Sequence, residues 1–211
     1  SRQGEVEIWE GDKRLGYLAP DGRIAGQPVS FGVGVYAIYE DHAHNLWLGT
    51  RGKGLYRLRY RSPGKYDITG HYMKDARGVY GISGDAVYAI LQDYKGRLWV
   101  ACYDSGLNLV ENPLADTLTF LHADNRLGSQ SRNIPEQVRC LAETSDSVIL
   151  VGTTRGFYTF DENFSSPEDI IFYYSERQKD DANSLGSNDI MGIEVTRGGD
   201  IYLAVFGGGL N

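Results

Sequence analysis

One pattern recurs four times in this chain of 211 residues, and it limits the possible folds more than any other feature. Successive copies start at residues 35, 87, 138 and 190, which lie 52, 51 and 52 residues apart. A period this regular predicts a repeat architecture. The copies read VYAIYEDHAHNLWLGTRGKGLYRL, VYAILQDYKGRLWVACYDSGLNLV, VRCLAETSDSVILVGTTRGFYTF and IMGIEVTRGGDIYLAVFGGGLN.

Each copy predicts three short strands. The first, such as Val35 to Tyr39, is an apolar run without polar alternation, which is typical of a strand covered on both faces. A polar turn follows, and then a second apolar strand that ends at a small residue, where a larger side chain would hold the neighbouring sheet away. These small residues are Gly49, Ala101, Gly152 and Ala204. A glycine-bearing turn, whose glycines supply the positive φ of tight hairpins, leads into the third strand.

Aromatic stretches between the copies predict a fourth strand, at 66–73, 118–122 and 170–174. Four antiparallel strands in about 50 residues are the blade of a β-propeller. We therefore predict an all-β fold, a β-propeller of four-stranded antiparallel blades, present here as a partial propeller of about four blades. The single domain of 1–211 divides into an outer half-blade and link (1–34), blades at 35–86, 87–137 and 138–189, and a truncated blade at 190–211.

The two ends of the chain leave the closure of the ring open. Val6 to Trp9 and Leu15 to Leu18 predict a hairpin without the two strands that would precede it. The fourth copy stops at Asn211 as it enters its third strand, so we expect the chain to be a piece of a longer protein. The final strands could pair with the N-terminal hairpin and close a small ring. The favoured alternative is an open arc, completed by further blades or by a second copy.

The first two copies resemble the repeat of the two-component regulator propeller family, which follows approximately V-x-x-I-x-x-D-x-x-G-x-L-W-I-G-T-x-x-G-G-L. The segment SLGSND before Ile190 is similar to the link that precedes each repeat in that family. The resemblance covers about four fifths of the chain. The third and fourth copies depart from it, because Leu150 and Tyr202 replace the tryptophan, and Thr144 and Thr196 replace the turn aspartate.

This resemblance implies a sensory role. Proteins with such repeats are typically the periplasmic part of one-component or hybrid two-component regulators in Bacteroides-like bacteria, anchored in the inner membrane and linked to a kinase. Their signals are often breakdown products of glycans. The resemblance therefore implies that this segment binds an oligosaccharide, is not itself an enzyme and needs no cofactor.

Composition narrows the possible partners. The formal net charge of −7 argues against nucleic acid, since binding phosphates requires a basic surface. No run of 18 apolar residues occurs, so we expect no membrane contact by this segment. No nucleophile elbow, phosphate-cradling loop or HExxH string is present, so no catalytic residue is predicted.

The first polar turn contains His42 and His44 beside Asp41, a set that could bind a metal. The other copies carry no histidine there, so we interpret this as a solvated turn and predict no metal site. Asp41 and Asp93 are instead expected to cap their turns by accepting backbone N–H groups.

The cysteines and tryptophans are interpreted as structural. Cys102 and Cys140 lie in adjacent blades, so a disulfide is possible in an oxidising compartment, but free buried thiols are favoured. Trp47 and Trp99 occupy one repeat position and predict core between blades.

Strand alternation places the candidate site. Turns between second and third strands share a face with the links that enter the next first strand, and that face surrounds the propeller axis. Residues there differ between copies while the framework does not, and variable loops on a fixed scaffold carry specificity. Their mixed chemistry suits an oligosaccharide. The predicted residues are Arg51, Lys53, Tyr80, Tyr103, Asp104, Arg132, Asn133, Arg155, Asn188 and Phe206, with Asp189 beside them.

Two other functions remain open from the sequence. The chain could be a structural or protein-interaction propeller of secretion or cell-surface machinery, with a homodimer or the rest of the ring as its partner. It could also belong to a propeller lyase or hydrolase, which would bring carboxylates together at the axis. Asp104 and Asp189 are the candidates on the expected face.

Overall fold

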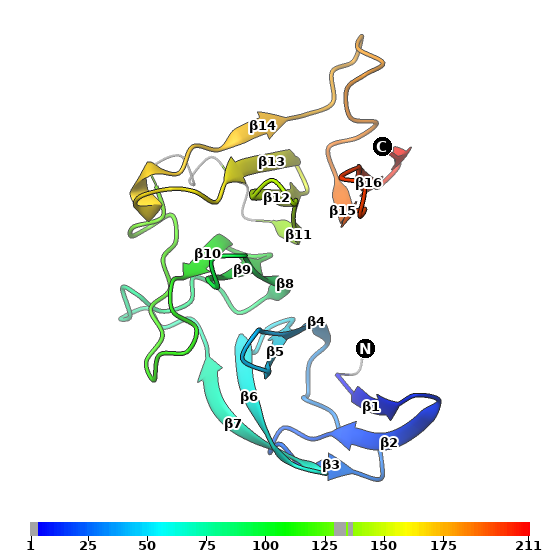
Figure 1. Cartoon of the computed structure of the whole chain (residues 1–211), viewed down its shortest axis with the longest axis vertical. Coiled ribbons are helices and arrows are strands. Elements are labelled where there is room, and N and C mark those ends of the chain that lie inside the picture. The colour runs from blue at the N-terminus through cyan, green and yellow to red at the C-terminus, as the bar shows by residue number, and fades with distance from the viewer. Residues whose placement is uncertain (1–3, 129–133, 135–136) are drawn as a thin grey trace.

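The computed structural model describes residues 4–128, 134 and 137–211. Within these residues the chain forms five antiparallel sheets of three or four strands. Figure 1 shows the sheets following one another around an arc, with the strands β4, β8, β11 and β15 on its concave side. The predicted fold class, an all-β partial propeller, is confirmed.

The five sheets are named here in chain order. The N-terminal sheet contains β1 (Val6–Glu10), β2 (Lys13–Leu18) and β3 (Ile24–Ala25). The first blade contains β4 (Val35–Glu40), β5 (Asn45–Thr50), β6 (Leu55–Ser62) and β7 (Lys65–Tyr72). The second blade contains β8 (Val87–Gln92), β9 (Leu98–Cys102) and β10 (Gly106–Val110). The third blade contains β11 (Val138–Glu143), β12 (Val148–Thr153), β13 (Gly156–Asp161) and β14 (Tyr173–Ser175). The last sheet contains β15 (Ile190–Val195), β16 (Ile201–Val205) and β17 (Gly209–Leu210).

The predicted fourth strands are only partly correct. The stretch 66–73 matches β7, but 118–122 makes only an isolated bridge between Leu109 and Leu121. The reason is that the N–H of Phe120 donates to the carbonyl of Tyr80 in the link at 2.9 Å, so the pairing with β10 is confined to the two hydrogen bonds between Leu109 and Leu121. In the third blade the 3₁₀ turn Pro167–Asp169 delays the outer strand to Tyr173.

The N-terminal hairpin is present as predicted, and β3 adds a third strand to it. The N-terminal sheet and the last sheet are separate sheets with no ladder between them in the described residues. Of the two expected arrangements, the structure therefore has the open arc (Figure 1). The part of the chain that the structure describes contains no helix that could span a membrane.

The core lies between successive sheets. Trp47 and Trp99 are fully buried, and each packs against residues of the following blade, Val87 and Val151 for example. Burying one such large side chain stabilises the fold by about 1.5–3 kcal/mol. The prediction that both tryptophans form core between blades is confirmed, whereas Trp9 is exposed.

Small residues allow the close approach of neighbouring blades. A Cβ atom at Gly49 would lie 2.7 Å from Cγ1 of Val87, the first residue of the next inner strand. At Gly152 it would lie 2.8 Å from Cγ2 of Ile190 and would also meet Sγ of Cys140. The structure thus confirms the predicted packing reason for glycine at these two positions.

Asp41 and Asp93 cap their turns as predicted. Asp41 Oδ1 accepts the N–H groups of Ala43 and Asn45 at 2.9 and 2.8 Å, and Asp93 Oδ1 accepts the N–H of Arg97 at 2.9 Å. In addition, the second carboxylate oxygen of each aspartate accepts the indole N–H of the tryptophan six residues later, at 2.8 Å. One buried carboxylate therefore ties the turn to the core between blades.

Candidate ligand-binding site

A β-bulge recurs at one position in all four inner strands. The pairing of each inner strand with its neighbour shifts by one residue immediately after the strand begins. The extra residue redirects its side chain, and bulges often lie next to functional sites for this reason. The four bulged residues are Tyr36, Tyr88, Arg139 and Met191.

The bulges correct one prediction. The first strand of each copy was expected to be covered on both faces, yet Tyr36 is 40% exposed and Met191 is 48% exposed. Along β4, buried Val35 and Ala37 alternate with exposed Tyr36 and Ile38. The inner strand packs on the next blade with one side and turns its other side toward the concave surface, so only one face is covered.

Three tyrosines form a continuous aromatic group across the first two blades. The rings of Tyr36 and Tyr88 meet edge to face with centroids 4.6 Å apart. Tyr88 stacks on Tyr103, from the β9–β10 turn, at 4.6 Å and 18° between the rings. Burial raises the pKa of Tyr88, and the positive charge of Arg51 opposes that shift. The three rings together offer a broad aromatic surface.

Arg139 extends this group to the third blade and the last sheet. Its guanidinium carbon lies 5.4 Å from the ring centroid of Tyr103, which is within cation–π range. Its Nε lies 3.4 Å from Oδ1 of Asp189, and its Nη1 donates to Sδ of Met191 at 2.7 Å. We call the six residues Tyr36, Tyr88, Tyr103, Arg139, Asp189 and Met191 the axial group.

The hairpins and links adjoin as the strand alternation predicts. Tyr103 N–H donates to Ala86 carbonyl at 2.7 Å, and Phe206 N–H donates to Asp189 carbonyl at 2.8 Å. The first blade has the same arrangement, since Arg51 N–H donates to Gly34 carbonyl at 2.9 Å. Each second-to-third-strand turn is thereby fixed beside the start of an inner strand.

The predicted site residues from the first two hairpins have different surroundings. Arg51 is exposed, and Lys53 is half-buried with its ammonium donating to the carbonyl of Phe31 at 2.9 Å. Tyr103 is a member of the axial group. The Oδ2 of exposed Asp104 accepts the N–H of Asp85 at 3.2 Å, so this carboxylate holds the link.

The predicted residues from the third and fourth copies differ in exposure and in their hydrogen bonds. Arg155 is exposed, and its carbonyl accepts the hydroxyl of Tyr174 at 2.7 Å. Asn188 is half-buried and holds the preceding loop, because its Oδ1 accepts the N–H of Arg177 at 2.6 Å. Phe206 presents a ring that is 69% exposed beside Asp189.

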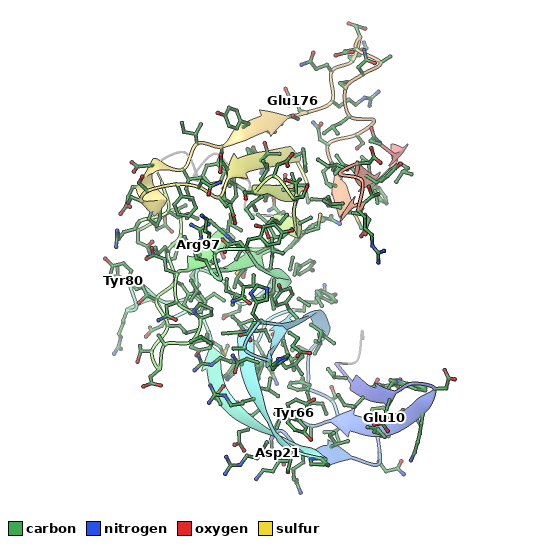
Figure 2. The ribbon with its side chains drawn as sticks, in the orientation of Figure 1. Glu10, Asp21, Tyr66, Tyr80, Arg97 and Glu176 are labelled. Atoms are coloured by element: carbon green, nitrogen blue, oxygen red, sulfur yellow. The ribbon has the colours of Figure 1, made fainter. Side chains whose placement is uncertain are left out.

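Tyr80 lies apart from the other predicted residues. Figure 2 shows it on the outer side of the arc, away from the inner strands, and its carbonyl accepts the N–H of Phe120 in the outer segment of the second blade. The link before β8 is long enough to carry this residue outward. Arg132 and Asn133 lie outside the described residues.

Sequence reasoning missed Tyr36, Tyr88, Arg139 and Met191. The available signal was variation at the second position of each copy, between a constant Val or Ile and a constant small residue. It was overlooked because a bulge is visible only once two strands are paired. The contact between Arg139 and Asp189 joins residues 50 apart in sequence and follows from the stacking of blades.

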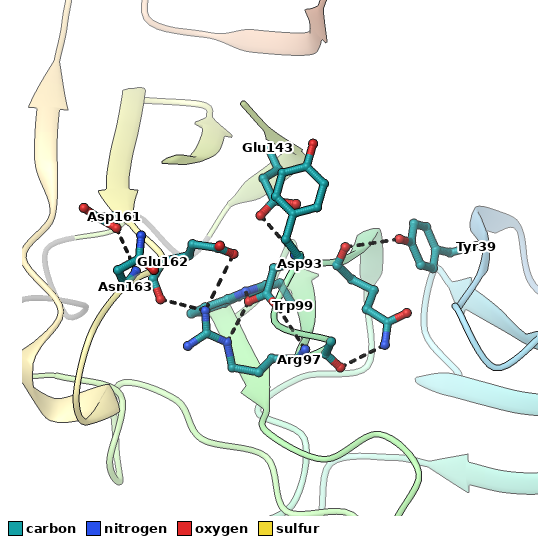
Figure 3. A network of polar contacts seen from close by, with 11 residues as sticks. Tyr39, Asp93, Arg97, Trp99, Glu143, Asp161, Glu162 and Asn163 are labelled. Atoms are coloured by element: carbon teal, nitrogen blue, oxygen red, sulfur yellow. Dashed lines mark hydrogen bonds and ion pairs between the residues drawn. The ribbon is translucent and has the colours of Figure 1, made fainter. Parts of the chain in front are cut away.

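A polar network ties the second blade to the third at the opposite ends of the inner strands (Figure 3). Arg97 Nε lies 2.7 Å from Asp93 Oδ2, and its Nη2 donates to the carbonyl of Glu162 at 2.8 Å. Glu143 Oε1 accepts the N–H of Tyr94 at 3.2 Å. Burial and then the hydrogen bond to Glu162 raise the pKa of Glu143 to about 8. We interpret this network as a structural tie.

Other groups considered in the sequence have no catalytic arrangement. The solvated-turn interpretation fits His44, which is exposed and pairs with Glu40, and the described residues contain no cluster of three or more metal-ligating side chains. Cys102 and Cys140 are free thiols. Burial raises the pKa of both to about 12, so neither is a reactive thiolate.

An open cleft of about 620 Å³ lies between the third blade and the last sheet. Phe157 and Leu203 provide its apolar wall, and the loop after β14 provides Glu176, Asp181 and Asn183. Glu176 marks this region at the end of β14 in Figure 2. The cleft shares no residue with the axial group, so the two sites can be distinguished by experiment.

Comparison with known families identifies the repeats. Residues 31–52 and 81–104 match the family described as two component regulator propeller. The two matches fall on the first two copies of the repeat, which carry both the turn aspartate and the tryptophan. No curated protein is a significant match to the chain.

Solved structures share the fold at low identity. One is described as the extracellular domain of a hybrid two component system of B. thetaiotaomicron, with a TM-score of 0.59 and 21% identity over 83% of this chain. A streptogramin B lyase matches with a TM-score of 0.56 and 15% identity over 98% of this chain. A gluconolactonase of Xanthomonas campestris gives a TM-score of 0.56 and 14% identity over 96%. This chain spans 20%, 62% and 63% of those three chains, respectively.

Proposed function

We propose that this chain is a ligand-binding propeller segment of a periplasmic sensor in a two-component regulator, and that its ligand is an oligosaccharide derived from a glycan. The axial group carries the proposal, because one bulge per inner strand directs a different side chain to the same concave surface. The repeats of the two component regulator propeller family support the sensory role.

The chemistry of the axial group suits a sugar. The rings of Tyr36, Tyr88 and Tyr103 offer apolar faces against which a pyranose can stack. Arg139 and Asp189 provide donors and acceptors for hydroxyl groups within the same group. Small-ligand sites usually combine such apolar surface with a few fixed polar groups.

A catalytic role for the segment is not favoured. The enzyme alternative needs carboxylates that converge at the axis, and each of the two candidates instead interacts with a different neighbour. Asp104 accepts the N–H of Asp85, and Asp189 pairs with Arg139. The resemblance in fold to a lyase and a gluconolactonase carries no reaction to this chain, since fold does not determine function.

The test is a melting experiment with a panel of neutral and acidic oligosaccharides. A ligand that binds only the folded state at 100 times its Kd stabilises it by about 2.7 kcal/mol, or about 5–10 °C for a chain of this size. We expect one or more oligosaccharides to produce such a rise, and we expect Tyr88→Ala to remove it.

Tyr94→Ala is the matched control, because Tyr94 is 64% exposed on the β8–β9 turn at the opposite end of the strand. A rise that survives Tyr88→Ala would place the ligand elsewhere. If no oligosaccharide stabilises the protein, the interaction-module alternative replaces this proposal.

We also propose that a second copy or further blades extend the open arc. Light scattering tests this by measuring the mass of the protein in solution.

A further inference from the structure

We infer that the ligand of the axial group carries an anionic substituent, a carboxylate or a sulfate, that binds the guanidinium of Arg139. This inference rests on the proposed function and narrows its ligand class. Arg139 is the one cation among the four bulged residues, at the position where the other copies carry Tyr36, Tyr88 and Met191. The tyrosines of the first two blades would thus contact the face of the sugar ring, and Arg139 of the third blade would bind its charged group.

The N–H donors of Arg139 have few good acceptors within the protein. A guanidinium has five N–H groups, and a thioether is a weak acceptor. Nη1 donates to the sulfur of Met191, and Nη2 reaches Oδ2 of Asp189 only at 3.5 Å. Nε has no hydrogen-bond partner among the described residues, although it is buried. An oxyanion would be a better acceptor than the thioether sulfur, and Arg–oxyanion bonds are among the strongest in proteins.

Asp189 neutralises the charge of Arg139 only in part. Its Oδ1 lies 3.4 Å from Nε of Arg139 without hydrogen-bond geometry, and this oxygen has no hydrogen-bond partner in the described part of the chain. The pair is therefore close but poorly aligned. An incoming carboxylate or sulfate can engage the Nη groups while Asp189 holds the guanidinium in position, so binding need not break the pair.

The face around the axial group also differs in charge from the protein as a whole. The protein has a formal net charge of −7, yet this face carries four cations, Arg51, Lys53, Arg139 and Arg155. They lie with three acids, Asp104 from a hairpin and Asp85 and Asp189 from the links. The carboxylate of Asp104 is already engaged by the N–H of Asp85. Cations gathered around a concave surface raise the local concentration of anionic ligands. A site for neutral sugars would gain nothing from this arrangement.

The position of Arg139 over Tyr103 defines the geometry. The guanidinium lies 5.4 Å from the ring centroid, and Tyr103 continues the stack with Tyr88. A pyranose on the tyrosine surface could therefore place an exocyclic carboxylate or sulfate next to the guanidinium. This describes an acidic sugar residue, either a uronate or a sulfated hexose.

The test uses three small probes that differ in charge: glucuronate, glucose 6-sulfate and glucose. Each is titrated to about 100 mM at constant ionic strength, a range that detects affinities in the millimolar range. The signal is the Nε–Hε resonance of Arg139 in ¹⁵N-labelled protein, assigned by its loss in Arg139→Met. We expect glucuronate or glucose 6-sulfate to shift this resonance saturably, and to bind at least about tenfold more tightly than glucose. Which anion binds distinguishes a uronate from a sulfate ester.

Two control variants interpret the result. Arg61→Met removes the same charge from an exposed residue on β6 and should leave the shifts unchanged. Arg139→Lys keeps the charge without the planar fork and should weaken binding. Because this variant lacks the Arg139 resonance, its binding is followed by the backbone N–H resonance of Tyr103, whose ring lies under the guanidinium in the natural sequence. Equal binding of glucose and both anions would overturn the charged-ligand inference while leaving the axial site in place. An Arg139 resonance that no anion shifts overturns it as well, and the oligosaccharide melting panel then decides separately whether the proposed function stands.

Discussion

The polar turns of the first two blades differ from those of the third blade and the last sheet, and the difference shows how a repeat protein maintains one fold with two kinds of turn. In the first two blades a buried aspartate accepts both backbone N–H groups and the indole of a tryptophan. In the later copies Thr144 and Thr196 accept one backbone N–H each, at 3.2 and 3.1 Å.

The two substitutions occur together for a physical reason. An indole N–H buried without an acceptor costs about 1–3 kcal/mol, so tryptophan is disfavoured once the carboxylate is lost. Conversely, a buried carboxylate needs more donors than one backbone N–H to offset its desolvation. The copies with Thr accordingly carry Leu150 and Tyr202 in place of the tryptophan. The predictions below test this difference, from the largest expected effect to the smallest.

Asp93→Ala should cause the largest loss of stability. Asp93 is fully buried, and its removal leaves the indole N–H of Trp99 and the Nε–H of Arg97 without their acceptor. Breaking such a buried pair costs about 3–5 kcal/mol. Urea unfolding at pH 7 measures the change, with Thr144→Ala as the matched variant, expected to cost about 1 kcal/mol. Equal losses in the two variants would remove the distinction between the two kinds of turn.

Trp99→Phe should cost less than Asp93→Ala, about 1–3 kcal/mol, because the ring stays buried while the carboxylate loses one donor. The double-mutant cycle of Trp99→Phe with Asp93→Asn isolates the pair. We expect a coupling of about 0.5–3 kcal/mol, as for other residues in direct contact. Additive losses would show that the indole bond contributes nothing beyond packing.

The stability of the protein should depend on pH through Glu143, which lies where the second and third blades meet. The pKa of Glu143 in the folded protein is about 8, above its ordinary 4.5, because of burial and then the neighbouring Glu162. The folded state therefore binds a proton more tightly than the unfolded state, so the stabilising contribution is complete below about pH 4.5 and is lost as the pH rises toward 8.

Glu143→Gln should remove this fall in stability. We expect the variant to melt about 2–4 °C above the natural sequence at pH 8.5, a shift equivalent to about 1 kcal/mol after allowing for screening of a partly exposed side chain. Scanning calorimetry between pH 5 and 9 measures it, with the exposed Glu7→Gln as the control. A parallel pH profile in both variants would contradict the shifted pKa of Glu143.

The smallest effect should come from the turn tips. His44 and Ser147 adopt positive φ, at 61° and 64°, where the corresponding residues of the second and fourth copies are Gly96 and Gly199. His44→Gly should stabilise the protein by about 0.5–1 kcal/mol, because glycine adopts this conformation without steric cost. Urea unfolding is the measurement, and a loss of stability would show that the exposed contact with Glu40 outweighs the relief.

The sequence was sufficient for the features that repeat. The spacing of Trp47 and Trp99 predicted core between blades, and Gly49 and Gly152 predicted close approach, because each depends on local pattern and on stacking of identical units. The prediction of a strand at 118–122 was wrong. The hydrogen bond from Phe120 to Tyr80 interrupts the pairing there, and its formation depends on the path of the link, which the local pattern does not determine.

The candidate site was less accessible from the sequence. Hairpin positions such as Tyr103 could be placed by strand alternation alone. Tyr36, Tyr88, Arg139 and Met191 could not, because the bulge that exposes them is a property of strand pairing and not of composition. The displacement of Tyr80 and the pairing of Arg139 with Asp189 depend in the same way on how links and blades stack.

The most direct test of the central claim uses the two methionines of the chain. Met191 lies in the axial group beside Arg139, whereas Met73 follows the outer strand β7. With ¹³C-methyl methionine, we predict that a stabilising oligosaccharide shifts the Met191 methyl resonance and leaves that of Met73 unchanged. Binding that shifts Met73 alone, or neither methyl, would contradict the account, because the ligand would then lie away from the bulged residues of the inner strands.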